Sequence, residues 1–429
     1  MSKATLERGV AILREQIDAP TASYFSSCVH CGMCADACLF YTETGDPRYT
    51  PIHKLEPMRR LWEQEFTLVG RLKKLIGLSK PVTDEEMEQW VDLVYNSCTL
   101  CGRCSMVCPV GNDISYMVRR IREGFTAAGH APDGLVGATT RAVKIGSPMG
   151  IKLPALHAQA SHVKDNCGLE IPFDREGVDY LVLLSSMEVI NFPEYLEAIA
   201  KIFKQAGKSW TLSSDAFEAT NSGIQIGSSD IARELVSRVV EAAEKLKVKT
   251  LISPECGHAY TAIRWEGPNL MGRPFTFKVK HIVEVLDELR AEGKLRVEGV
   301  EDPRMTFHDP CQLVRKGGVI KQPRNLLKMV ANNFVEMEDH GTMNWCCGAG
   351  GGVGAIEEAG ELKLTAFNRK KAQLKQLNVD VLVTACANCR IQLEEGLEEN
   401  EMEIPVVGLT EMLAAHLIED DKQQDGDGS

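Results

Sequence analysis

The feature that most constrains this 429-residue chain is a cysteine spacing that occurs twice in its N-terminal part. Both copies read C-x2-C-x2-C-x3-C. The first consists of Cys28, Cys31, Cys34 and Cys38, and the second of Cys98, Cys101, Cys104 and Cys108. The chain has fifteen cysteines, and its start is charged without the apolar core of a signal peptide. In a reducing compartment such a count indicates metal or redox chemistry rather than structural disulfides.

This spacing predicts two [4Fe–4S] cubanes with crossed ligands. Three cysteines two residues apart can wrap one cluster, while the next helix carries the fourth cysteine to the other cluster. The first cluster would take Cys28, Cys31, Cys34 and Cys108, and the second Cys98, Cys101, Cys104 and Cys38. Leu39 replaces the usual proline, which leaves the thiolates intact. Two zinc sites are the alternative, but zinc needs four ligands, and the third evenly spaced cysteine is then superfluous.

The 59 residues between the two motifs exceed what a compact bacterial ferredoxin uses. This layout resembles the helical ferredoxin domain of succinate dehydrogenase iron–sulfur subunits. We therefore expect residues 1–130 to form a helical ferredoxin-like domain, which begins with an amphipathic helix over 3–18.

Strands alternate with helices beyond residue 176, which predicts a multidomain α plus α/β protein with mainly parallel sheets. Two units of similar pattern, 176–298 and 299–418, indicate an internal duplication with an offset of roughly 130 residues. Residues 131–175 are rich in Pro, Gly, His and Lys and are expected to be a linker. The acidic end, 419–429, is expected to be a disordered tail.

Five further cysteines lie in the last unit, each after a predicted strand, where α/β sheets gather ligands at their carboxyl edge. They are Cys311, Cys346, Cys347, Cys386 and Cys389. The adjacent pair cannot easily face one tetrahedral metal, but it can hold two irons of a cluster. Glycines 348 and 350–352 let the backbone approach closely and supply N–H groups toward sulfur.

The spacing of these five cysteines resembles the CCG domain of heterodisulfide reductase. The whole layout over residues 20–418 resembles the HdrD component of that enzyme and its relatives, which include the DsrK, TmcB and glycolate oxidase iron–sulfur subunits. The resemblance implies that the five cysteines hold an unusual [4Fe–4S] centre that meets a disulfide or thiol. It thus implies three clusters in total, two cubanes and one of the CCG type.

The first α/β unit departs from this pattern. When the two units are aligned with an offset of 133 residues, Cys346, Cys347 and Cys386 fall on serines 213, 214 and 253. Cys311 falls on Ser186 at a slightly smaller offset. Only Cys256 survives, and a lone thiol cannot hold a cluster, so this unit should be empty. That departure favours the DsrK- and TmcB-like branch of the family.

Several smaller features have both a functional and a structural interpretation. His308 and Asp309 could move protons to a departing thiolate, or they could support the loop before Cys311. Cys256 and His258 could project toward the special centre, or Cys256 could be a leftover thiol. Arg315 and Lys316 could offset cluster charge, or lie on a solvated turn. The run GAGGGVG lacks the GK[ST] ending of a nucleotide loop, and the unpartnered Cys167 is expected to be a bystander.

Charge and hydropathy exclude two classes of protein. The formal net charge of −12 has the wrong sign for a general nucleic-acid binder. The sequence contains no uninterrupted run of 18 or more apolar residues, so no membrane-spanning helix is expected. The stretch 59–80, however, is basic with an apolar helical stripe. It suits docking on a membrane or a membrane subunit, or it is an ordinary helix packed on the ferredoxin domain.

The resemblance implies an oxidoreductase subunit that reduces a disulfide or oxidises thiols, with electrons passing through two cubanes. It also implies a partner subunit with haem b or a quinone site, and other redox subunits. The chain would lie in the cytoplasm, attached peripherally to the inner face of the cytoplasmic membrane. The substrate could be a small disulfide or thiol, or a protein disulfide.

The alternative is a pure electron relay between a flavoprotein, such as glycolate oxidase, and a quinone pool. A third interpretation is that the five-cysteine unit is a zinc-bound scaffold.

Overall fold

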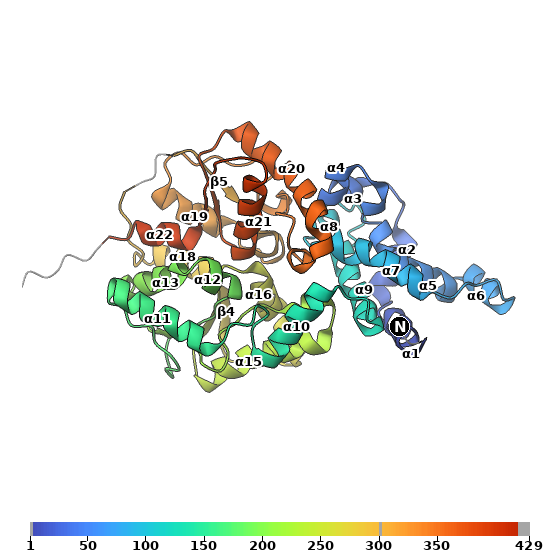
Figure 1. Cartoon of the computed structure of the whole chain (residues 1–429), viewed down its shortest axis with the longest axis horizontal. Helices are drawn as coiled ribbons and strands as arrows, with labels where there is room; N and C mark the ends of the chain where they lie inside the picture. Colours follow the sequence, from blue (N-terminus) through green and yellow to red (C-terminus); the bar gives the residue numbers. More distant parts are fainter. Residues whose placement is uncertain (1–2, 300–302, 419–429) are drawn as a thin grey trace, which may run out of the picture.

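The computed structural model describes residues 3–299 and 303–418, a helical part followed by two α/β units (Figure 1). The helical part occupies one end of the molecule, and the two units lie together at the other (Figure 1). The predicted combination of a helical domain and parallel α/β units is confirmed. The predicted tail, 419–429, lies outside the described residues.

The helical part centres on one buried helix, α9 (Ile114–Ala128), which begins at the capping residue Asp113 and ends at Gly129 in a left-handed conformation. Helix α1 lies along it, and a Cβ atom on Gly9 would come within 2.4 Å of the Ala128 Cβ, so the close approach requires glycine. The other helices are α1 (Lys3–Glu15), α2 (Ala19–Ser27), α3 (Met33–Asp36), α4 (Leu39–Thr44), α5 (Glu56–Phe66), α6 (Leu68–Leu75), α7 (Asp84–Val91) and α8 (Arg103–Met106).

The basic stretch 59–80 forms two helices rather than one. Helix α5 ends at Phe66, and the Thr67 side chain accepts a hydrogen bond from the Gly70 amide at 3.0 Å, which starts α6 anew. The two helices pack on each other and project from the molecule as an arm (Figure 1).

The expected linker, 131–175, contains the helices α10 (Asp133–Ile145) and α11 (Leu153–Cys167). Helix α10 packs on α14 (Ser222–Ile226) and α15 (Ser229–Lys245), and α11 packs on α13 (Glu194–Gln205). Proline and glycine mark the ends of these helices: Pro132 precedes α10, while Gly146 and Gly168 follow α10 and α11 with positive φ. The prolines and glycines from which an irregular linker was predicted therefore lie at the ends of these two helices.

Each α/β unit is built on a parallel sheet. In the first unit the strand order is β2-β1-β3-β4, and in the second it is β5-β6-β7. The elements of the first unit are β1 (Tyr180–Val182), α12 (Ser186–Asn191), α13 (Glu194–Gln205), β2 (Trp210–Thr211), α14 (Ser222–Ile226), α15 (Ser229–Lys245), β3 (Thr250–Ser253), α16 (Gly257–Thr261), α17 (Gly267–Met271), β4 (Lys278–His281) and α18 (Ile282–Ala291). Those of the second are β5 (Met305–His308), α19 (Lys321–Val330), α20 (Gly360–Leu377), β6 (Val381–Thr384), α21 (Ala387–Glu398), β7 (Val406–Gly408) and α22 (Leu409–Ala415).

The two units repeat one plan. Strands β1, β3 and β4 correspond to β5, β6 and β7, at an offset of about 130 residues. A parallel bridge between Met305 and Phe334 takes the place of β2 in the second unit. One hydrophobic core runs through both, from Ile252 and Leu286 to Phe307 and Leu413. The units are therefore packed as a pair, with the cysteine-bearing unit supported by the one that lacks its cysteines.

Candidate iron–sulfur sites

The two N-terminal motifs share one backbone conformation. His30 and Leu100, third in their motifs, both have φ of 54°, and the glycines after the second cysteines, Gly32 and Gly102, have φ of 82° and 77°. The short helices α3 and α8 then begin, and each carries the third cysteine of its motif. Glycine suits this left-handed position because it has no Cβ atom. The sequence signal for this turn is the CG pair in each motif.

The structure brings the first set of four cysteines together. Burial, helped by the neighbouring thiols of Cys28, Cys31 and Cys108, raises the pKa of Cys34 to about 11. Cys108 belongs to the second motif, so the set crosses between the motifs. Cys31 is exposed, which leaves this site at the protein surface.

The second set crosses in the opposite sense. Burial raises the pKa of Cys104 well above its usual value, and the thiols of Cys101, Cys38 and Cys98 add to the effect. A cavity is lined by all four of these cysteines and by Lys54. Four soft sulfur donors around one cavity fit a [4Fe–4S] cluster by their chemistry.

Lys54 is a buried cation beside the second set, and no sequence pattern pointed to it. Its ammonium group donates to the Cys38 thiol at 3.3 Å and to the Ser97 carbonyl, and it lies 5.2 Å from the Phe40 ring centroid. Burial alone would lower the Lys54 pKa, but the Cys38 and Cys98 thiolates outweigh it and raise the pKa. Lys54 therefore stays charged, and its positive charge favours electrons at this site.

We expect Lys54→Met to lower the reduction potential of the second cluster by on the order of 100 mV, because one buried charge at several ångströms is worth about 3 kcal/mol. The potential of the first cluster should not move. An EPR-monitored redox titration measures both. Lys54→Arg, which keeps the charge, is the matched control, and equal shifts at both clusters would contradict the assignment.

The five cysteines of the last unit gather at one edge of its sheet. Cys311 follows β5 and Cys386 follows β6, and these strands are parallel neighbours, so both residues leave the sheet at the same edge. Cys389 lies one turn into α21. Cys346 and Cys347 come from the glycine-rich loop between Met343 and Val353. All five are buried.

The thiols form a continuous series. The Cys311 and Cys346 sulfur atoms are 4.0 Å apart. Hydrogen bonds from Cys346 and Cys389 lower the pKa of Cys347, and a hydrogen bond from Cys389 lowers that of Cys386. The Gly348 amide donates to the Cys346 sulfur at 3.5 Å. Five buried thiols, each in contact with the next, are more than one zinc ion uses, so the donor set fits a cluster better.

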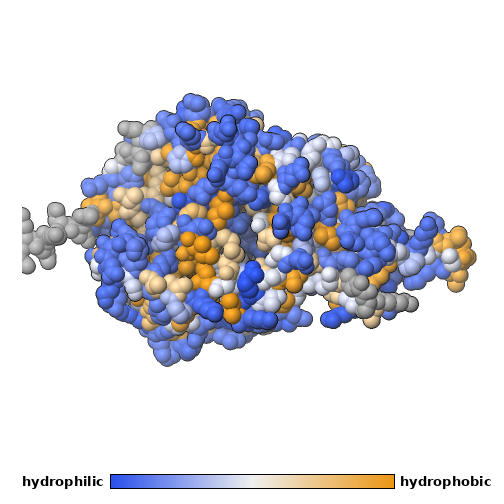
Figure 2. Space-filling view, in the orientation of Figure 1, coloured by the Kyte–Doolittle hydropathy of each residue, from blue (hydrophilic) through white to orange (hydrophobic). Residues whose placement is uncertain are grey.

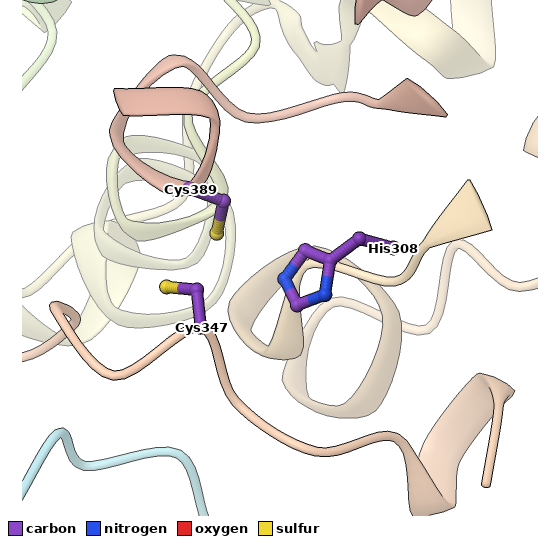
Figure 3. Close-up of side chains that lie close together, drawn as sticks. All are labelled: His308, Cys347 and Cys389. Atoms are coloured by element: carbon purple, nitrogen blue, oxygen red, sulfur yellow. The ribbon is translucent and has the colours of Figure 1, made fainter. Parts of the chain in front are cut away.

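His308 completes one side of this group. Its ring points at Cys347 and Cys389, and the ligand atoms of the three residues lie within 4.8 Å of one another (Figure 3). Both ring nitrogens are buried without a hydrogen-bond partner among the described residues. Burial and the nearby Lys370 lower the His308 pKa well below its usual value. The imidazole is therefore neutral and a weak base, so it is suited to binding a metal through a ring nitrogen rather than to donating a proton.

Asp309 has a structural role. Its carboxylate pairs with Arg324 and accepts a hydrogen bond from the Gly341 amide at 2.7 Å.

Lys370 on α20 is a second buried cation to which no sequence pattern pointed. Burial lowers its pKa to about 8, although Asp309 and the Cys347 thiolate oppose that effect.

The second motif lies directly on the five-cysteine site. The Cys346 thiol contacts the Thr99 hydroxyl at 3.4 Å, and Arg315 donates to the Cys101 carbonyl at 2.8 Å. A hydrogen bond between the Cys101 and Cys346 thiols raises the Cys101 pKa. Arg315 also bonds the Asn344 side chain at 2.8 Å, so it joins the two sites rather than lying on a solvated turn.

The glycine run makes this contact possible. A Cβ atom on Gly351 would lie 2.6 Å from the Thr99 carbonyl carbon, and Gly351 has φ of 60°. The buried Arg122 guanidinium donates to three backbone carbonyls: that of Gly351 at 2.5 Å, that of Cys98 at 2.7 Å and that of Gln225 at 2.7 Å. The run therefore packs against the helical part of the molecule, a role that explains its glycines.

The first α/β unit contributes to the edge of the site. Burial raises the pKa of Cys256, and the neighbouring Cys386 adds to the effect. The backbone of Gly257 donates to Cys386 and helps to lower its pKa. His258 lies farther along and accepts a hydrogen bond from the Gly351 amide at 3.1 Å. The Cys167 thiol donates to the Val163 carbonyl of its own helix at 3.1 Å.

Family models match both cysteine-rich regions. A 4Fe-4S dicluster domain matches residues 24–112, and the cysteine-rich CCG domain matches residues 305–394. The chain is 26% identical to an Hdr-like menaquinol oxidoreductase iron-sulfur subunit of Archaeoglobus profundus, over 92% of this chain and 80% of that protein. It is 27% identical to a subunit of the dihydromethanophenazine:CoB–CoM heterodisulfide reductase of Methanosarcina barkeri, over 91% of this chain and 93% of that protein.

A third relative is the EtfAB:quinone oxidoreductase of Syntrophomonas wolfei, 27% identical over 88% of this chain and 56% of that protein. The predicted resemblance to HdrD-like iron–sulfur proteins of the heterodisulfide reductase type is thus confirmed. No helix within residues 3–299 and 303–418 has the length and apolar character needed to cross a bilayer.

Proposed function

We propose that this chain, a homologue of HdrD-like iron–sulfur proteins, carries electrons between a redox partner and a thiol–disulfide couple at its five-cysteine site. Reduction of the disulfide takes two electrons and two protons and yields two thiols. The observation that carries the proposal is the direct contact between the second motif and the five-cysteine site, through Cys101, Thr99 and Cys346.

We assign three [4Fe–4S] clusters to three groups of cysteines, of which the second and third are in contact. The three groups are Cys28, Cys31, Cys34 and Cys108; Cys98, Cys101, Cys104 and Cys38; and Cys311, Cys346, Cys347, Cys386 and Cys389. When bound, such clusters supply one-electron transfers at potentials set by charge and hydrogen bonding. The unpartnered nitrogens of His308 face the third group and support a metal centre there.

Of the three groups of cysteines, the first is the one that a partner protein can reach. Cys31 is exposed, and large apolar residues within two positions of Cys31 or Cys108 are open to solvent: Val29 (70% exposed), Met33 (49%), Met106 (52%) and Val110 (47%). An apolar rim around an exposed redox site suits a protein partner. The proposed partner is a membrane subunit with haem b or a quinone site, which would hold the chain at the inner face of the cytoplasmic membrane.

The opposite end favours a small substrate. The five thiols are each at most 5% exposed, and the glycine loop and the second motif lie against them. A protein disulfide would need a larger opening than a small thiol or disulfide needs. The proposed chemistry at this site is therefore that of a low-molecular-weight thiol–disulfide couple.

A second candidate function is a pure relay between a flavoprotein and a quinone pool. The likeness to an EtfAB:quinone oxidoreductase over 88% of this chain favours it. In that case the five-cysteine site would pass electrons without binding a sulfur substrate.

Two measurements distinguish these functions. Anaerobically purified chain should contain about twelve irons and essentially no zinc, whereas about eight irons would leave the third group without a cluster. Oxidised protein titrated with small thiols should then develop a new paramagnetic signal. If the iron count is about twelve and no thiol changes the spectrum, the relay is correct and the disulfide chemistry is not.

A further inference from the structure

The arm formed by α5 and α6 carries a concentration of exposed apolar side chains. Seven large apolar residues of its outer half are solvent-exposed: Phe66, Leu68, Val69, Leu72, Leu75, Ile76 and Leu78. Leu68 is 85% exposed and Leu75 is 83% exposed. The end of the arm is hydrophobic in the space-filling view (Figure 2). A contiguous apolar surface of this kind on a folded protein marks an interaction site.

The apolar residues lie on one face of α6. Leu68, Leu72 and Leu75 follow the three-to-four spacing of a helix, while Gly70 lies on the other side, packed against α5. A Cβ atom on Gly70 would clash with the Glu63 carbonyl, so the helix is held with its apolar face outward. The exposure is therefore fixed by the packing of the arm.

The charge of the outer part of the arm is opposite to that of the chain. Residues 66–80 contain four basic residues, Arg71, Lys73, Lys74 and Lys80, and no acidic residue, whereas the whole chain has a net charge of −12. Lys73 borders the apolar face, while Lys74 lies nearer the Gly70 side, 3.6 Å from the Glu65 carboxylate of α5. A short helix with a leucine face and a lysine border is typical of helices that lie in the interface of an anionic bilayer.

We infer that the α5–α6 arm inserts the apolar face of α6 into the headgroup region of an anionic lipid bilayer. The arm projects from the body of the protein, so it can reach a flat bilayer before the acidic surface does (Figure 1). This contact goes beyond the proposed function, in which attachment is through a partner subunit. It needs neither a bound cluster nor a partner.

The test is cosedimentation of the purified full-length chain with vesicles of phosphatidylglycerol and phosphatidylcholine, or of phosphatidylcholine alone. The chain should bind the anionic vesicles, and salt should weaken the binding. Lys73→Gln with Lys74→Gln should lower binding to anionic vesicles by about 25-fold, since each charge near the surface contributes about fivefold. Leu72→Ser with Leu75→Ser should lower it by at least about tenfold.

Trp265→Ser is the matched control, because Trp265 is an exposed apolar residue outside the arm (52% exposed). It should bind like the wild type, and unchanged iron content shows that each variant is folded. Absence of binding to anionic vesicles overturns the inference. So does binding that requires membranes with their proteins, which would indicate a protein partner, or a dimer that the leucine variant dissociates, which would indicate a second copy.

Discussion

Replacing Cys347 by serine is expected to lower the iron content from about twelve to about eight per chain and to abolish thiol-dependent EPR signals. Cys347 lies in the middle of the thiol series, between Cys346 and Cys389, and it faces His308. A serine hydroxyl is a hard, poor ligand for a site built of soft sulfur donors. The signals of the two N-terminal clusters should remain, because their cysteines belong to other groups.

Two serine variants make this result specific. Cys167→Ser should keep about twelve irons, since the Cys167 thiol donates to the Val163 carbonyl of its own helix and belongs to none of the three groups. Cys256→Ser tests whether the sixth nearby thiol is a ligand, and with five ligands sufficient it should also keep about twelve. Retention of twelve irons by Cys347→Ser, with loss in Cys256→Ser, would refute the proposed ligand set.

Arg122→Met is expected to destabilise the contact between the helical part and the α/β units by about 3–5 kcal/mol. The fully buried guanidinium donates to carbonyls of three regions, at Cys98, Gln225 and Gly351. Methionine fills similar space but leaves these acceptors unpaired. Hydrogen exchange of the amides in 94–98 and 224–228 should become on the order of a thousandfold faster.

Arg119→Gln is the matched control on the same helix. Arg119 also reaches the first α/β unit, but through a partly exposed ion pair with Glu266. Such pairs contribute about 0–1 kcal/mol, so exchange in this variant should change by less than about tenfold. Equal effects of the two substitutions would show that the buried hydrogen bonds of Arg122 do not hold the parts together.

The sequence predicted those features that depend on short-range spacing. The C-x2-C-x2-C-x3-C pattern fixes which cysteines can share a loop, and the periodic apolar runs fix helices such as α15 and strands such as β3. The duplication could be predicted because the strands β1 and β5 each begin a similar alternation of strands and helices. The linker prediction over 131–175 missed two helices, because Pro132 and Gly146 also occur at helix ends.

Other parts of the site could not be read from spacing. Lys54, Lys370 and Arg122 are buried by elements distant in sequence, and a lysine or arginine on a helix gives no local sign that it will be buried. The proximity of Thr99 to Cys346 joins residues 247 positions apart. The assignment to the DsrK- and TmcB-like branch and the crossed ligand sets remain predictions.

The buried contact between the second motif and the five-cysteine site also makes the spacing of the redox sites a property of domain docking. Loop 99–101 and the glycine loop lie against the thiols, and Arg122 and Arg315 fasten the contact from both sides. A change in how the helical part docks would therefore alter the separation between the second and third groups of cysteines without removing a sulfur donor from either.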